Sequence, residues 1–438
     1  MSDPQLMLVP GSTDPFALTR TYSAIHKLWE FFEREEKTGQ ARAQWIIVAP
    51  RPDKQCYPDV LADNAAALQA RFRAVPEDVD VIVETSGSAT GSPHLVGLSY
   101  SALVASARAT HEVLGGPGRW ITALPAYHIA GLQTLVRSCV AGTSPAIADM
   151  SNGFSADNLA RACRSALPSS GNNPTGRTYL SLVPKQLRDA LDTGGELVDL
   201  LGQLDAILVG GSAFDPQLRE RATEAGLTVV ATYGMTETGG GCVYDGRPLP
   251  GTRVRIEDGC VELAGNTLFS DYIDAPGSAQ ISLEGTTRWL RTGDRGRLHD
   301  GELTVLGRAD DVIISGGVNV DPTQVEHAIA ATCPEVDQVC VVSLPDPVWG
   351  SVVAAAVTLK TASGTAANTD GDGFDAAAAK EWGPRLRDRV GDALGRDQSP
   401  RVVAVAAQLP TTGIGKIPRK QVRTLIEHAR GDGKVWER

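Results

Sequence analysis

Between residues 79 and 231, short apolar runs that favour strands alternate with longer segments that favour helices. The expected strands are residues 79–85, 120–124, 178–183, 206–209 and 228–232. The expected helices are residues 99–113, 131–140, 156–167, 184–191 and 215–225. Buried parallel strands that alternate with helices form an open α/β sheet. Ligands of such sheets bind beyond the carboxyl ends of the strands, so the loops that follow these strands are candidate sites.

The pattern changes after residue 250. Short strands with glycine-rich turns at residues 251–306 predict a small β subdomain. Beyond residue 307 the pattern becomes a compact α+β one, interrupted by a Gly-, Ala- and Thr-rich stretch at residues 361–375 that predicts a surface loop. With 438 residues, the chain has room for two domains. We therefore expect a large α/β domain over residues 1–307, which includes the β subdomain, and a smaller mobile α+β domain over residues 308–438.

Composition narrows the class of protein. The net charge of −11 disfavours nonspecific binding to nucleic acid or to anionic lipid. The first residues show no basic region followed by an apolar run, and no apolar stretch reaches the roughly 20 residues of a membrane span. Seven cysteines without C-x-x-C spacing argue against a disulfide framework or a zinc site. We expect a cytoplasmic protein without nucleic-acid or membrane partners, and a homodimer is an open possibility.

A glycine- and hydroxyl-rich segment, residues 85–94, directly follows the first expected strand. Its backbone N–H groups and hydroxyls are suited to holding phosphate oxygens. It is not a Walker A loop, because no Gly-Lys-Ser/Thr follows. Taken alone, such a segment is more often a flexible turn. The candidate phosphate-binding residues are Ser86, Gly87, Ser88, Thr90 and Gly91.

Four further segments follow in order along the second half of the chain. They are Tyr-Gly-Met-Thr-Glu-Thr at 233–238, Arg-Thr-Gly-Asp at 291–294, Gly-Arg-Ala-Asp-Asp at 307–311 and Thr-Thr-Gly-Ile-Gly-Lys-Ile-Pro-Arg-Lys at 411–420. Each segment alone is weak evidence for a family, but the four together and in this order resemble the adenylate-forming acyl-CoA synthetase superfamily. The resemblance implies an enzyme that joins a carboxylate to AMP and then passes the acyl group to coenzyme A. ATP and coenzyme A would be its co-substrates, and Mg²⁺ would be its cofactor.

The resemblance also implies a nucleotide site. The loop after residue 209 would line the adenine, Tyr233 would stack on the base, and Thr236 would bind the α-phosphate. Glu237 would hold Mg²⁺ through an oxygen, as a hard cation requires. Asp294 would accept hydrogen bonds from the ribose hydroxyls, although a Gly-Asp pair is commonly only a turn. The remaining nucleotide contacts would come from Gly211, Ser212, Ala213, Gly234, Met235 and Arg308.

The last implied roles belong to the second domain. Lys416 would place its ammonium between the attacking carboxylate and the α-phosphate, where negative charge develops. Asp310 would be the hinge on which the small domain rotates, and Gly316 and Gly317 would line the pantetheine channel for coenzyme A. The segment at 85–94 resembles the family's phosphate loop with two departures: it has one extra residue between the glycines, and His94 occupies the position of the family's lysine. Histidine lacks the permanent charge of lysine.

Three segments resemble, more narrowly, the o-succinylbenzoate–CoA ligases of menaquinone biosynthesis. They are residues 124–133, 181–187 and 233–246, with Lys185 where that family usually has threonine. The implied acid carries an aromatic and a succinyl carboxylate. The candidate acyl contacts are His128, Ser181, Gly239, Gly240 and Gly241. Two alternatives stay open: another aryl- or acyl-CoA ligase, and a nucleotide-binding homologue that has lost catalysis, which the altered phosphate loop suggests.

Overall fold

The computed structural model describes residues 4–42, 44–56, 75–85, 93–171, 173–360, 373–411 and 417–438. The chain forms two compact units. The first comprises Met1–Arg255, Glu262–Thr292 and Leu298–Leu303, and the second comprises Ile256–Val261, Gly293–Arg297 and Thr304–Arg438. The expected boundary at residues 307 and 308 stays a prediction. No helix of the described residues is long and apolar enough to cross a bilayer.

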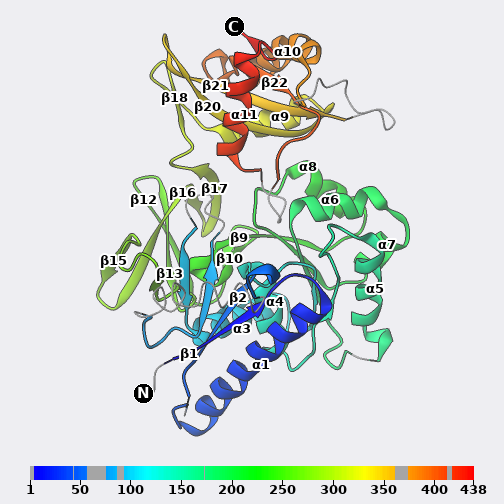
Figure 1. The fold of residues 1–438 in the computed structure, drawn as a ribbon, viewed down its shortest axis with the longest axis vertical. Coiled ribbons are helices and arrows are strands. Elements are labelled where there is room, and N and C mark those ends of the chain that lie inside the picture. Colours follow the sequence, from blue (N-terminus) through cyan, green and yellow to red (C-terminus); the bar gives the residue numbers. More distant parts are fainter. Residues whose placement is uncertain are drawn as a thin grey trace. The chain divides into compact units, whose positions relative to one another are not determined.

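The first unit contains a five-stranded sheet in the order β1-β2-β3-β4-β14. Its strands are β1 (Gln5–Pro10), β2 (Ile46–Arg51), β3 (Val81–Glu84), β4 (Leu95–Leu98) and β14 (Asp271–Tyr272). The strand expected at residues 79–85 therefore lies in this sheet, where it pairs antiparallel with β4. Helix α1 (Pro15–Thr38) begins at the cap Asp14, which accepts hydrogen bonds from two backbone amides. The helix lies beside β1 (Figure 1). It buries Leu18 and Ile25 in the core that it shares with this sheet.

A seven-stranded sheet in the order β11-β10-β9-β8-β7-β5-β6 completes the core of the first unit. Strands β6, β5, β7, β8 and β9 are parallel, while β10 and β11 run antiparallel. The strands are β5 (Arg119–Thr122), β6 (Ala146–Ile147), β7 (Thr178–Leu182), β8 (Ala206–Val209), β9 (Val229–Met235), β10 (Gly240–Tyr244) and β11 (Arg247–Pro248). The helices are α3 (Tyr100–Val113), α4 (Ile129–Val140), α5 (Ala156–Ala166), α6 (Pro184–Thr193), α7 (Gly195–Leu201) and α8 (Pro216–Glu224). This alternation confirms the α/β pattern expected from the sequence.

The expected β subdomain is a sheet in the order β12-β13-β16-β15, with β17 paired to β16. Its strands are β12 (Thr252–Glu257), β13 (Cys260–Gly265), β15 (Ile281–Glu284), β16 (Thr287–His299) and β17 (Glu302–Arg308). The division between the two compact units runs through these strands.

The second unit contains the hairpin of β18 (Ile313–Ser315) and β19 (Val318–Val320), and a four-stranded sheet in the order β20-β21-β22-β23. Alternate residues of this sheet enter two separate cores, as the two-residue period of a strand requires. Helices α9 and α10 cover one face and α11 covers the other (Figure 1). These elements are α9 (Pro322–Thr332), β20 (Val336–Asp346), β21 (Gly350–Leu359), α10 (Ala376–Leu394), β22 (Val402–Val405), α11 (Arg419–Gly431) and β23 (Trp436–Glu437). The loop expected at residues 361–375 lies outside the described residues up to 372.

Candidate active site

The two ends of the candidate phosphate loop are fastened to each other. The amide of Thr85 donates to the carbonyl of His94 at 2.9 Å, and the amide of His94 donates to Oγ1 of Thr85 at 2.8 Å. These bonds continue the antiparallel pairing of β3 and β4. The loop between them therefore starts and ends at one fixed point. The candidate residues Ser86, Gly87, Ser88, Thr90 and Gly91 lie outside the described residues.

The side chain of His94 faces the segment that contains β14. Its Nδ1 lies 3.3 Å from Oδ2 of Asp274, and its ring centroid lies 4.8 Å from that of Tyr272. The other oxygen of Asp274 accepts a hydrogen bond from the amide of Leu95 at 2.7 Å. The residue that replaces the family's lysine thus has protein partners of its own.

The candidate adenine loop follows β8. Gly210 packs so closely against β9 that an added Cβ would lie 2.1 Å from Oγ1 of Thr232. Gly211, Ser212 and Ala213 come next and are exposed. Because β8 and β9 are adjacent and parallel, this loop and Tyr233 near the end of β9 lie at the same edge of the sheet. The structure therefore brings these four predicted residues to the edge of the sheet where the parallel strands end.

The motif after Tyr233 forms a tight turn. Gly234 and Met235 end β9, and Thr236, Glu237 and Thr238 form a single 3₁₀ turn, η3. Oγ1 of Thr238 accepts from the amide of Met235 at 2.9 Å and donates to the carbonyl of Gly240 at 2.7 Å. This closes the turn and leaves Thr236 and Glu237 half-buried at its start.

Glu237 is held at two points by the segment around β14. Its carbonyl accepts a hydrogen bond from the amide of Phe269 at 2.8 Å. Its carboxylate Oε1 accepts a hydrogen bond from the hydroxyl of Tyr272 at 2.7 Å. Burial, followed by the negative charge of Glu237, raises the pKa of Tyr272, so the phenol keeps its proton at neutral pH. No motif of the sequence points to Tyr272, because 34 residues separate it from Glu237 and only the fold brings the two together.

Three of the candidate acyl residues, His128, Gly239 and Gly240, lie around α4. His128 precedes the helix as its N-cap residue, half-buried, with its ring 4.7 Å from that of Tyr127. Gln133, inside the helix, donates from Nε2 to the carbonyl of Gly239 at 2.6 Å. Gly240 packs on the same glutamine, since an added Cβ there would lie 3.3 Å from its Cγ. Gln133 is thus a residue that sequence reasoning passed over, although it stands five residues after His128.

The remaining acyl candidates, Gly241 and Ser181, lie in strands of the seven-stranded sheet. Gly241 pairs with Gly234 across β9 and β10. Ser181 is buried in β7, opposite Leu208 of β8. Lys185, where the family usually has threonine, makes an ion pair with Asp189 one turn later in α6, with its Nζ 2.7 Å from Oδ2. That lysine therefore acts as an ordinary surface residue of its helix.

In the second unit, Arg308 connects two of the predicted residues. Its Nη1 lies 3.6 Å from Oδ1 of Asp294, and its Nε and Nη2 donate to the carboxylate of Asp310 at 2.9 and 3.2 Å. Gly293 permits this approach, because a Cβ there would lie 2.4 Å from Nη2. Burial tends to lower the pKa of Arg308, but these carboxylates outweigh it and raise the pKa.

The hairpin of β18 and β19 turns at Gly316 and Gly317, both with positive φ. The ring of Trp349 covers Gly316, where a Cβ would lie 2.4 Å from the indole. The predicted catalytic Lys416 lies outside the described residues. Three residues after Lys416 in the sequence, Arg419 at the start of α11 donates to Oε2 of Glu326 at 2.9 Å and lies 3.2 Å from Oδ2 of Asp311.

Comparison with known proteins adds family evidence. Residues 29–264 match the model of the AMP-binding enzyme family, and residues 324–416 match that of the AMP-binding enzyme C-terminal domain. A probable 2-succinylbenzoate–CoA ligase of Mycobacterium tuberculosis is 40% identical over 349 residues, which cover 79% of this chain and 84% of the relative. The 2-succinylbenzoate–CoA ligase of Escherichia coli is 30% identical over 354 residues, which cover 78% and 68%.

Solved structures share the fold. The o-succinylbenzoate CoA synthetase of Bacillus subtilis, in complex with its acyl-adenylate intermediate, is similar with a TM-score of 0.68 and 22% identity over 96% of this chain and 88% of that one. MatB of Rhodopseudomonas palustris with bound ATP has a TM-score of 0.72 and 18% identity over 99% and 98%.

Proposed function

This chain belongs to the AMP-binding enzyme family, and from that premise we propose that it is an ATP-dependent o-succinylbenzoate–CoA ligase. The enzyme joins the acid to AMP with release of pyrophosphate, and then transfers the acyl group to coenzyme A. The observation that carries the choice of acid is the 40% identity to a probable 2-succinylbenzoate–CoA ligase across 84% of that relative. The product serves menaquinone biosynthesis.

The nucleotide binds at the edge of the seven-stranded sheet. Gly211, Ser212 and Ala213 line the adenine and Tyr233 stacks on it, a role supported by the adjacency of β8 and β9. Thr236, at the start of η3, binds the α-phosphate. In the second unit, Asp294 accepts hydrogen bonds from the ribose, and Arg308 at 3.6 Å holds that carboxylate.

Glu237 fits the requirement of Mg²⁺. Magnesium in nucleotide-dependent enzymes is usually held by one or two carboxylates and the substrate's own phosphates. Within the described part of the chain, no group of three or more His, Cys, Asp or Glu side chains could hold a metal ion by itself. The carboxylate of Glu237, with one oxygen engaged by Tyr272, matches a site in which the protein supplies one carboxylate and the phosphates of ATP supply other ligands. The bound ion would neutralise charge on the phosphates during transfer.

The acyl group binds on the α4 side of the site. His128 at the start of the helix is within the chain segment that contacts the acid, and the glycine turn from Gly239 to Gly241 lets a flat ring approach the backbone. Gln133 holds this turn through Gly239. Ser181 is the further polar candidate from β7.

The second unit supplies the moving parts. Lys416 stabilises the charge that develops when the carboxylate attacks the α-phosphate. Asp310 is the hinge on which the small domain rotates between the two half-reactions. Gly316 and Gly317 line the channel for coenzyme A. Cytoplasmic location and homodimer formation are further predictions of the same proposal.

Pyrophosphate release and acyl-CoA formation, measured together with several acids, test the proposal. With ATP, Mg²⁺ and coenzyme A, o-succinylbenzoate should be used roughly tenfold to a hundredfold better than benzoate, succinate or a medium-chain fatty acid. The reason is that polar groups left without a partner by an incomplete acid cost about 1–3 kcal/mol each. Preference for another acid would leave only the broader ligase class, and ATP binding without pyrophosphate release would indicate a homologue that has lost catalysis.

A further inference from the structure

The segment around β14 joins two parts of the nucleotide site. At one end, the amide of Phe269 donates to the carbonyl of Glu237 at 2.8 Å. At the other end, the amide of Ile273 donates to the carbonyl of Leu95 at 2.7 Å, just past the phosphate loop. In between, Tyr272 pairs with Val96 in the five-stranded sheet. The segment therefore holds a constant position relative to both the phosphate loop and the turn that carries Glu237.

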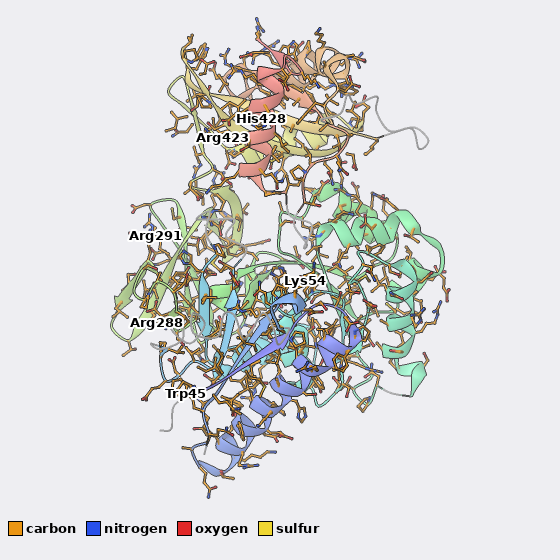
Figure 2. The ribbon with its side chains drawn as sticks, viewed as in Figure 1. Trp45, Lys54, Arg288, Arg291, Arg423 and His428 are labelled. Carbon is orange, nitrogen blue, oxygen red and sulfur yellow. The ribbon has the colours of Figure 1, made fainter. Side chains whose placement is uncertain are left out.

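An arginine from the β subdomain fixes the same segment. Arg288, labelled in Figure 2, donates from Nη1 to the carbonyl of Phe269 and from Nη2 to that of Ser270, each at 3.1 Å. Two bonds from one planar guanidinium restrict the backbone in more than one direction. The ring of Phe269 also packs on Tyr272, with centroids 4.9 Å apart. Backbone and side-chain contacts thus place the tyrosine ring in one orientation.

The tyrosine hydroxyl acts on the carboxylate of Glu237. A glutamate has several rotatable bonds, and holding Oε1 at 2.7 Å from the phenol removes much of that freedom. One fixed oxygen also fixes the direction of the other, which is then available to a cation. Groups that hydrogen-bond a metal ligand commonly orient it in this way.

His94 also contacts Tyr272, and Asp274 holds His94. The imidazole lies against the phenol ring, with centroids 4.8 Å apart. Asp274 engages Nδ1 at 3.3 Å and is itself fixed by the amide of Leu95 at 2.7 Å. The backbone of His94 is tied to Thr85. The imidazole is therefore part of a chain of contacts that ends at the carboxylate of Glu237.

We propose that Tyr272 is a positioning residue for metal binding by Glu237, and that His94 acts by holding Tyr272 and does not replace the phosphate-loop lysine as a contact to pyrophosphate. This inference rests on the proposed role of Glu237 in an ATP-dependent ligase, but it is independent of which acid the enzyme uses. It assigns a function to a histidine that the family pattern leaves unexplained.

The metal dependence of ATP binding tests the role of Tyr272. In Tyr272→Phe, the Mg²⁺ concentration that half-saturates ATP binding in calorimetry should rise roughly tenfold, the lower end of the usual range for losing a partner of a metal ligand. Mn²⁺ binding followed by electron paramagnetic resonance should weaken in parallel, while the KM for the acid stays within twofold. Tyr22→Phe is the matched control, because it removes a hydroxyl that bonds the carbonyl of Thr143 at 3.1 Å.

A double-mutant cycle separates positioning from a general loss of structure. Glu237→Gln should remove most of the metal dependence, and adding Tyr272→Phe to it should then change nothing further. An undiminished effect of Tyr272→Phe in the Glu237→Gln background would overturn the proposal. All of these measurements use ATP and metal alone, so they stand even if o-succinylbenzoate proves not to be the acid.

His94 variants distinguish its two possible roles. His94→Ala should shift the Mg²⁺ requirement in the same direction as Tyr272→Phe, and the two changes combined should be no worse than Tyr272→Phe alone. His94→Phe, which keeps a ring against Tyr272, should restore most of the loss. If His94→Phe instead raises the Kd for ATP tenfold at saturating Mg²⁺, and His94→Lys does not, the histidine contacts the phosphates and our inference is wrong.

Discussion

The imidazole of His111 accepts a hydrogen bond at Nε2 from the indole nitrogen of Trp120, at 3.1 Å, in the interior of the first unit. An accepting nitrogen carries no proton, so this bond requires a neutral ring. The guanidinium of Arg137 lies over the same indole, 4.7 Å from its centre. Burial first, and then the charge of Arg137, lower the pKa of His111 to about 4.

This lowered pKa predicts acid sensitivity. An unfolded histidine has a pKa of about 6.5, so the unfolded chain binds an extra proton between that value and about 4. The contribution of neutral His111 to the free energy of unfolding is therefore complete above pH 6.5 and is lost as the pH falls toward 4. Between pH 7 and pH 5, the free energy of unfolding of the wild type should fall about 2 kcal/mol more than that of His111→Gln. Urea unfolding at both pH values measures this, and parallel losses in the two proteins would refute it.

Gly131 allows the first turn of α4 to pack against the chain that precedes it. A Cβ there would lie 2.2 Å from the carbonyl oxygen of Pro125 and 2.5 Å from that of Leu124. Backbone atoms cannot easily move aside, so Gly131→Ala should cost about 3 kcal/mol or more of stability and should raise the KM for the acid by displacing His128.

Gly142, just beyond the same helix, provides the matched control. It has φ of 66° but nothing within 4 Å of an added Cβ. Gly142→Ala should therefore cost only about 1–2 kcal/mol, the penalty of the left-handed conformation, without a change in KM. The test is to measure the urea unfolding midpoint and the KM for the acid substrate in both variants. Equal effects would mean that the close approach at Gly131 is not what makes its substitution costly.

The sequence predicted the parallel part of the fold because each buried strand shows locally as an apolar run. The expected strand at residues 206–209, for example, is β8. Which sheet a strand joins is not a local property. The run at residues 79–85 reads like the others, yet its strand β3 pairs with β4, which in turn pairs with β14 about 175 residues along the chain. No pattern within a single segment can show that partnership.

The same limit applies to the site. Glu237 stands in a motif, so the residues around it are enough to predict a metal-binding role for it. Tyr272 belongs to none of the recognised motifs, and its significance comes from a 2.7 Å contact that the fold creates. His94 departs from the family pattern in the sequence, but its contacts with Asp274 and Tyr272 exist only in the folded chain.

The cysteines predict a simple labelling pattern. All seven, which lie within the described ranges, are free thiols, and only Cys56 and Cys260 are partly exposed. Burial raises the pKa of Cys139, Cys163, Cys242 and Cys340 to about 12. Thiolates are the reactive form, so brief treatment of the native protein with a maleimide near neutral pH should modify Cys56 and Cys260 before the five buried cysteines. Mass spectrometry identifies the sites, and early labelling of Cys242 would contradict the structure.

The last prediction concerns Lys416 and the separation of the two half-reactions. Lys416 lies outside the described residues, but Arg419, three residues later, is held by Glu326 and Asp311. Lys416→Ala should slow acyl-adenylate formation about 10²–10³-fold, the usual cost of removing one group that stabilises developing charge. Coenzyme A should still react with added acyl-adenylate at close to the normal rate, because that step does not need the ammonium between carboxylate and phosphate. Lys420→Ala, which removes an exposed lysine of α11, should affect neither step. Equal losses in both half-reactions of Lys416→Ala would mean that the lysine maintains structure and does not act on the phosphate.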